Sequence, residues 1–156
     1  MFIKSALWFH KVNDTGWGIN SYRKIVDFND LDDFLYAYKM IESFSSGMFF
    51  LMKKDVKPVY EDKENKDGGI FSFKLSKKVC KTFWYELSHL FLEGNLTSKK
   101  IDFSKITGIS ISPKTNNCII KVWTNTCNNI DSGIFRDDID NLFLDECIFR
   151  KNKDQK

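Results

Sequence analysis

The chain has 156 residues, of which 42% are hydrophobic and 29% are charged, and its formal net charge is +3. This length suits one domain with a buried core, which we place at residues 1–150, followed by a solvated tail at residues 151–156. The mild charge excludes a protein that wraps a long duplex through many phosphates, although it permits a few phosphate contacts. No apolar run is long enough to cross a membrane, and the N-terminus lacks the apolar segment of a secretion signal.

The cysteines and histidines do not have the spacing of a zinc site. The four cysteines form no Cys-x-x-Cys pair, and the chain has only two histidines. We therefore expect no metal or other cofactor, reduced cysteines and a cytoplasmic location. The sequence also lacks a phosphate-binding glycine loop and a recognisable catalytic set, so we do not expect an enzyme.

Hydrophobic periodicity predicts the elements of the fold. Alternation predicts strands over residues 5–12 and 22–26, helical spacing predicts a helix over 31–41, and residues 48–52 suit a central strand. The later elements, in chain order, are a strand over 70–75 after a hairpin turn at Asp67-Gly68-Gly69, a helix between Ser76 and Gly94, a hairpin of strands 106–112 and 118–124, a helix over 132–142 and a strand over 147–149. This pattern predicts an α+β domain, with an antiparallel sheet and three helices on one of its faces.

Two polar loops carry large aromatic residues. Trp17 lies between two glycines, where a core position is disfavoured. Tyr60 stands next to Glu61 in the run of residues 58–69, which ends in a glycine pair. Two aromatic rings and one carboxylate are suited to hold a flat, positively charged ring that donates hydrogen bonds.

These motifs resemble the mRNA cap-binding translation initiation factor 4E family, whose ligand is 7-methylguanosine. The matching segments, in chain order, are Leu7-Trp8-Phe9, Trp17, Leu31–Tyr38, Pro58–Gly69, Phe83–Glu86 and Lys121–Thr124. The resemblance implies a curved antiparallel sheet with three helices packed on its convex face and the ligand on its concave face. The short chain, rich in lysine, asparagine and phenylalanine, suggests a divergent viral or parasite copy.

The resemblance also implies roles for the loop residues. Trp17 and Tyr60 would stack on the two faces of the methylated guanine, Glu61 would accept its N1–H and N2–H, and Trp123 would contact the N7-methyl group. The family has tryptophan at the position of Tyr60, so we expect a loss of about 1 kcal/mol in binding. Trp123 lies on an alternating strand and fits a core position equally well.

Phosphate binding is less completely matched. Lys114 takes the position of a family arginine that binds phosphate. Ile119 replaces the next basic residue, and Lys121, two residues along the same strand face, is a candidate substitute. Ile70 replaces a further family arginine.

The resemblance places a partner surface on the helices, where the family binds a scaffold or repressor peptide. The residues at matching positions are Leu31, Leu35, Tyr38, Tyr85, Glu86 and His89. Leu35 replaces an anchoring tryptophan, so we expect a different partner or a cognate scaffold with a changed motif.

The sequence therefore predicts a monomer that binds the capped 5′ end of mRNA and a scaffold, and that acts in translation initiation. Two alternatives remain open: a cap-binding repressor or competitor with the same pocket, and an interaction module that has lost the ligand. The replacements at Tyr60, Ile70 and Ile119 favour the second alternative.

Overall fold

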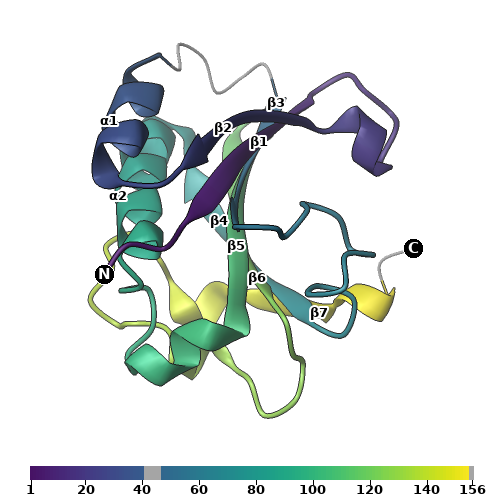
Figure 1. Ribbon diagram of the computed structural model, residues 1–156. Helices are drawn as coiled ribbons and strands as arrows, with labels where there is room; N and C mark the ends of the chain where they lie inside the picture. The colour runs from purple at the N-terminus through teal and green to yellow at the C-terminus, as the bar shows by residue number, and fades with distance from the viewer. Residues whose placement is uncertain (41–46, 155–156) are drawn as a thin grey trace.

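The computed structural model describes residues 1–40 and 47–154, and its elements are drawn in Figure 1. The strands are β1 (Ser5–Lys11), β2 (Arg23–Phe28), β3 (Gly47–Lys53), β4 (Gly69–Ser76), β5 (Ile106–Pro113), β6 (Asn117–Thr124) and β7 (Ile148–Lys151). The α-helices in this part are α1 (Leu31–Met40) and α2 (Cys80–Leu92). Short 3-10 turns are η1 (Ile19–Ser21), η2 (Lys77–Val79), η3 (Lys100–Lys105), η4 (Ser132–Ile134), η5 (Leu144–Glu146) and η6 (Asn152–Asp154).

The strands form one curved antiparallel sheet in the order β2-β1-β3-β5-β6-β4-β7. The predicted α+β class is confirmed, as is the hairpin of β5 and β6. The hairpin predicted at Asp67-Gly68-Gly69 is wrong, because β5 and β6 lie between β3 and β4 in the sheet. Residues 54–68 therefore form a long crossing loop, which passes over the face opposite α1 and α2 (Figure 1).

Alternation along the strands divides the sheet into two faces. A row of paired residues faces the helices and consists of Leu7, Leu51, Ile109, Val122, Phe71 and Phe149. Burying each large side chain of this row contributes about 1.5–3 kcal/mol. A row on the opposite face consists of Met52, Gly108, Trp123, Ile70 and Arg150. The main core thus lies under the helices, and a smaller cluster of Phe50, Met52, Val56, Ile70 and Trp123 lies under the crossing loop.

Local side-chain hydrogen bonds mark the helix boundaries. Before α1, Asp30 Oδ1 accepts from Asp33 N (3.0 Å), and Asp33 Oδ2 accepts from Asn29 N (2.9 Å), a reciprocal pattern that differs from a capping box by one residue. Gly94 follows α2 with a φ of +70°, which turns the chain so that the N–H of Asn95 donates to the carbonyl of Leu90 at 2.8 Å. The part of the predicted first helix at residue 41 lies outside the described residues.

The third predicted helix, over residues 132–142, does not form as an α-helix. The chain there makes η4, with Asp131 Oδ1 accepting from Gly133 N at 2.7 Å, and then becomes extended at Phe135. Phe135 pairs with Thr97 in a β-bridge and packs its buried ring against Phe71, with 5.0 Å between ring centroids. This tertiary contact outweighs the helical periodicity of the segment.

The start predicted for the solvated tail, residue 151, is too early in the chain. Lys151 is the last residue of β7, and Asn152 is buried. The backbone N–H of Asn152 donates to Gly68 O (2.9 Å), and its Nδ2 donates to Asn65 O (2.7 Å). These bonds attach the end of the described chain to the crossing loop.

Cys80 and Cys118 form a disulfide, which contradicts the expectation of reduced cysteines for this pair. Cys80 begins α2, and Cys118 pairs with Leu75 at the same end of the sheet, which brings the two Cα atoms to 6.6 Å. Cys127 and Cys147 are free thiols. No helix in the described ranges is long and apolar enough to span a bilayer.

Removing this crosslink should destabilise the protein. The bridged cysteines are 38 residues apart, so Cys118→Ser should lower the free energy of unfolding by about 4 kcal/mol in urea titrations. Cys127→Ser is the control and should change it by less than about 0.5 kcal/mol. Four thiols titrating in the unfolded, unreduced protein would contradict the disulfide.

Candidate functional site

A cavity of about 580 Å³ opens on the sheet face opposite the helices, between the crossing loop and the β1–β2 connection. All six predicted ligand-binding residues line it: Trp17, Tyr60, Glu61, Trp123, Lys114 and Lys121. They come from four separate segments, which the antiparallel register brings to one place. Lining residues that sequence reasoning did not single out are Tyr22, Met48, Phe50, Val59, Ser112 and Asp154.

The crossing loop is held by hydrogen bonds from its own polar side chains. Asp62 accepts from the backbone N–H of Lys57 through Oδ1 and of Glu64 through Oδ2, both at 3.0 Å. Such carboxylate caps favour tight turns over regular structure. The two caps fix the backbone on both sides of Tyr60 and Glu61.

Asn65 anchors the same loop to the sheet and is fully buried. Its Nδ2 donates to the carbonyls of Lys57 and Val59, each at 3.0 Å, and its Oδ1 accepts from Thr107 Oγ1 at 2.7 Å. A single amide therefore satisfies two loop carbonyls and one hydroxyl of β5. Sequence reasoning missed this residue, because an asparagine in a polar loop carries no signal of burial.

Tyr60 stacks on Trp123, with ring centroids 5.4 Å apart and planes inclined by 21°. Trp123 is buried, its Nε1 donates to Ser110 Oγ at 3.2 Å, and it still lines the cavity. It therefore combines the core and cavity positions that the sequence left open. Burial raises the pKa of the Tyr60 phenol, and the Glu61 carboxylate raises it further, so this ring stays neutral at physiological pH.

Trp17 is 56% exposed and stacks on the buried ring of His10, with centroids 4.3 Å apart and planes 4° from parallel. His10 Nε2 lies 2.6 Å from Gly16 O, and Nδ1 lies 2.9 Å from Lys11 O. Tyr22 contacts the same imidazole edge-on at 4.8 Å. His10 thus supports the indole from behind. The sequence signal for this position was strand alternation, which places His10 on the same face of the strand as Trp8.

Charges of both signs reach the cavity. Glu61 is exposed, and no ion pair in the described part involves it. Lys114 lies in the β5–β6 turn, where its N–H donates to Asn117 O at 2.8 Å. Burial lowers the pKa of Lys121, and the positive charges of Lys114 and Arg150 lower it further. The cavity therefore has carboxylates from Glu61 on the crossing loop and from Asp154, and cations from Lys121 on β6 and Lys114 in the β5–β6 turn.

The predicted partner surface lies on α1 and α2, and its residues differ in accessibility. Leu31 and Tyr85 are exposed, and Glu86 is exposed beside Tyr85. Leu35 packs partly against the core, and the hydroxyl of Tyr38 hydrogen-bonds Ser88 Oγ at 2.7 Å. His89 Nδ1 lies 2.9 Å from Glu93 Oε1.

Phe34 lies at the centre of this aromatic group, although sequence reasoning did not select it. It is fully buried, and its ring centroid lies 4.5 Å from that of Tyr38, 5.2 Å from Tyr85 and 6.0 Å from His89. The accessible part of the surface therefore centres on Leu31 and Tyr85.

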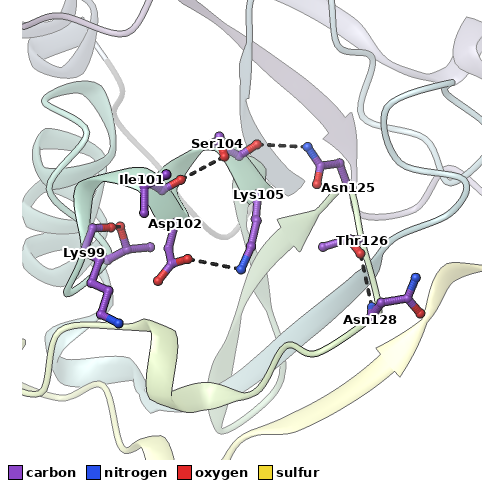
Figure 2. A network of polar contacts seen from close by, with 9 residues as sticks. Lys99, Ile101, Asp102, Ser104, Lys105, Asn125, Thr126 and Asn128 are labelled. Carbon is purple, nitrogen blue, oxygen red and sulfur yellow. Dashed lines mark hydrogen bonds and ion pairs between the residues drawn. The ribbon is translucent and has the colours of Figure 1, made fainter.

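Asn65→Ala should release the crossing loop. The substitution leaves two buried groups and the partly buried carbonyl of Lys57 without their partner, so we expect the free energy of unfolding to fall by about 3 kcal/mol in urea titrations. Asn125→Ala is the control, because Asn125 Nδ2 donates to Ser104 O at the exposed surface (Figure 2). That change should cost less than about 0.5 kcal/mol, and equal losses in both variants would contradict the anchoring role.

Comparison with known proteins places the chain in a family. The family model described as eukaryotic initiation factor 4E matches residues 4–149. Initiation factor 4E-1B of Danio rerio is 31% identical over 135 residues, which are 81% of this chain and 62% of that protein. Initiation factor NCBP of Triticum aestivum is 30% identical over 129 residues, 77% of this chain and 53% of that protein. The chain thus spans little more than half the length of these relatives.

Solved structures share the fold. The 4E-3 factor of Ascaris suum with m7G cap has a TM-score of 0.71 at 20% identity, over 81% of this chain and 73% of that one. The 4E-3 factor of C. elegans with the 4E-binding protein Mextli and cap analog has a TM-score of 0.77 at 19% identity, over 98% of this chain and 92% of that one. Because the family model covers most of its length, the chain belongs to the eukaryotic initiation factor 4E family.

Proposed function

We propose that this protein binds the 7-methylguanosine cap at the 5′ end of mRNA without covalent chemistry and acts in translation initiation. The observation that carries the proposal is the meeting of Trp17, Tyr60 and Glu61 at one cavity, with Trp123 in its wall. Two related structures were solved with m7G cap or a cap analog, which supports the same ligand here.

Each proposed stacking ring has a second ring behind it. His10 backs Trp17, and Trp123 backs Tyr60. A ring that is already held by a second ring loses less conformational freedom when a ligand stacks on its other face than a free ring does. The entropy cost of binding is therefore smaller. Methylation at N7 gives guanine a positive charge, which strengthens its attraction to the two electron-rich faces.

Glu61 supplies the proposed base specificity. Its carboxylate is exposed on the loop that carries Tyr60, and no ion pair in the described ranges competes for it. Guanine presents N1–H and N2–H side by side, so one carboxylate accepts both. Adenine offers no such donor pair and would leave the carboxylate desolvated and unpaired.

The partner is proposed to be a peptide segment of a scaffold on the α1–α2 face. Leu31 and Tyr85 are its accessible apolar contacts, and a C. elegans relative was solved with a 4E-binding protein. We propose that the cap-binding chain itself is a cytoplasmic monomer without enzymatic activity. Its engagement with a functional scaffold would make it an activator of translation.

A second candidate function is cap-bound repression. Leu35 packs partly against the core, and the Tyr38 hydroxyl is already bonded to Ser88, so this helical face offers fewer free groups to a scaffold. A protein with the pocket and a weak scaffold surface would hold capped mRNA out of initiation. Addition to a cap-dependent translation extract separates the two, since an activator raises the yield and a repressor lowers it.

The carboxylate and the indole should both be required for cap binding. In titrations of tryptophan fluorescence with 7-methyl-GTP, Glu61→Gln and Trp17→Ala should each weaken binding by about 100-fold, or about 3 kcal/mol. Glu64→Gln, which removes an exposed carboxylate of the same loop, is the control and should bind normally. Equal affinity of the native protein for GTP and 7-methyl-GTP would refute the proposal.

Tyr60→Trp should strengthen binding. Indole has a larger and more polarisable face than phenol, so we expect 7-methyl-GTP affinity to rise about fivefold, close to 1 kcal/mol. The gain should be smaller for unmethylated GTP, whose base is neutral. A loss of 7-methyl-GTP affinity in this variant would show that Tyr60 is not a stacking residue.

A further inference from the structure

A second cavity of about 270 Å³ adjoins the first on the same face of the sheet. Its lining consists of Tyr60, Ile70, Ser72, Lys121, Ile148 and Arg150. Tyr60 and Lys121 line both cavities, so the two are neighbours and share a wall. The second cavity extends the site toward β7, the edge strand of the sheet.

The sheet register explains why Arg150 reaches this place. Ile70 pairs with Trp123 on one side and with Arg150 on the other, so these three residues form one row across β6, β4 and β7. Alternation places Phe149 on the opposite face, where it packs against the core. Arg150 therefore lies beside Ile70, at the edge of the sheet face that contains both cavities.

Three cations follow one another along this face. Lys114 lines the first cavity, Lys121 lines both, and Arg150 lines the second. No ion pair of the described residues involves any of them. Their charges repel one another closely enough to lower the pKa of Lys121, beyond the larger effect of its burial. An anion placed among them would relieve this repulsion.

The described residues that line the second cavity include cations but no carboxylate. Glu61 and Asp154 line the first cavity, and neither lines the second. The Ser72 hydroxyl adds a hydrogen-bond donor to the second cavity. Arginine suits phosphate there, because its planar fork can donate two parallel hydrogen bonds to one phosphate group.

We infer that Arg150 is a phosphate-binding residue, and that the phosphate chain of a nucleotide bound in the first cavity runs along Lys114 and Lys121 to Arg150. This inference rests on the proposed function for the base, and it adds a residue from the edge strand to the site. The phosphates come either from the 5′–5′ triphosphate or from the phosphodiesters of the nucleotides that follow it.

The test compares Arg150→Gln with Lys151→Gln. Lys151 is an exposed neighbour on β7 that lines neither cavity, so its variant removes the same charge from the same strand. The ligands are 7-methylguanosine, 7-methyl-GTP and a capped RNA of a few nucleotides, titrated at several salt concentrations. Circular dichroism of both variants checks that they are folded.

Arg150→Gln should bind 7-methylguanosine normally and a phosphate-bearing ligand about five- to tenfold more weakly, whereas Lys151→Gln should bind all three normally. The slope of log affinity against log salt should shrink by about 0.7–1 for Arg150→Gln, as expected for one lost phosphate contact. If Arg150→Gln already binds 7-methyl-GTP more weakly, Arg150 contacts the triphosphate. If only its affinity for capped RNA falls, Arg150 contacts the phosphodiesters. Equal losses in both variants, or no loss in Arg150→Gln, would overturn the inference.

Inorganic tripolyphosphate separates this inference from the proposed function, because it contains no base. If 7-methyl-GTP and GTP bind alike, the cap proposal fails, and the tripolyphosphate titration still tests Arg150. Weaker tripolyphosphate binding by Arg150→Gln than by Lys151→Gln supports the cation track without a cap. If the two variants bind both tripolyphosphate and capped RNA equally, and the native protein still selects the methylated cap, Arg150 is rejected as a phosphate-binding residue while the cap proposal stands.

Discussion

The pairing of β6 with β5 on one side and β4 on the other determines the rest of this structure. It places Ile109, Val122 and Phe71 in one row under the helices, and Trp123 and Ile70 in the adjacent row on the opposite face. Because side chains alternate along a strand, a slip of one residue would bury Lys121 in the core and expose Val122. The apolar core thus fixes the register, and the register places the binding groups.

The cavity depends on groups that do not themselves reach a ligand. His10 holds the Trp17 ring through a parallel stack, and the buried Asn65 amide holds the loop of Tyr60 and Glu61 against β5. Asn152 then attaches the end of β7 to the same loop. The binding residues on the loops are therefore supported by buried polar side chains whose specific hydrogen bonds keep the loops in a defined geometry.

Much of the fold was predictable from the sequence, because strands and amphipathic helices leave local periodic signals. The first two helices, the β5–β6 hairpin and the edge strand near Ile148 follow from such patterns. The helix expected over 132–142 fails, because Phe135 pairs with Thr97 and enters the core. The disulfide between Cys80 and Cys118 was also missed, since it depends on the end of the sheet to which each cysteine is brought.

The sequence by itself determined the chemical inventory: two loop aromatics beside a carboxylate, lysines near a hairpin turn, and the family resemblance of the motifs in order. Only the tertiary structure decided which rings stand behind Trp17 and Tyr60, and that Arg150 lies beside Ile70. The physical reason is distance along the chain. Periodicity reports on neighbours within a few residues, whereas the juxtaposition of residues 70 and 150 arises from strand pairing that the packed core selects.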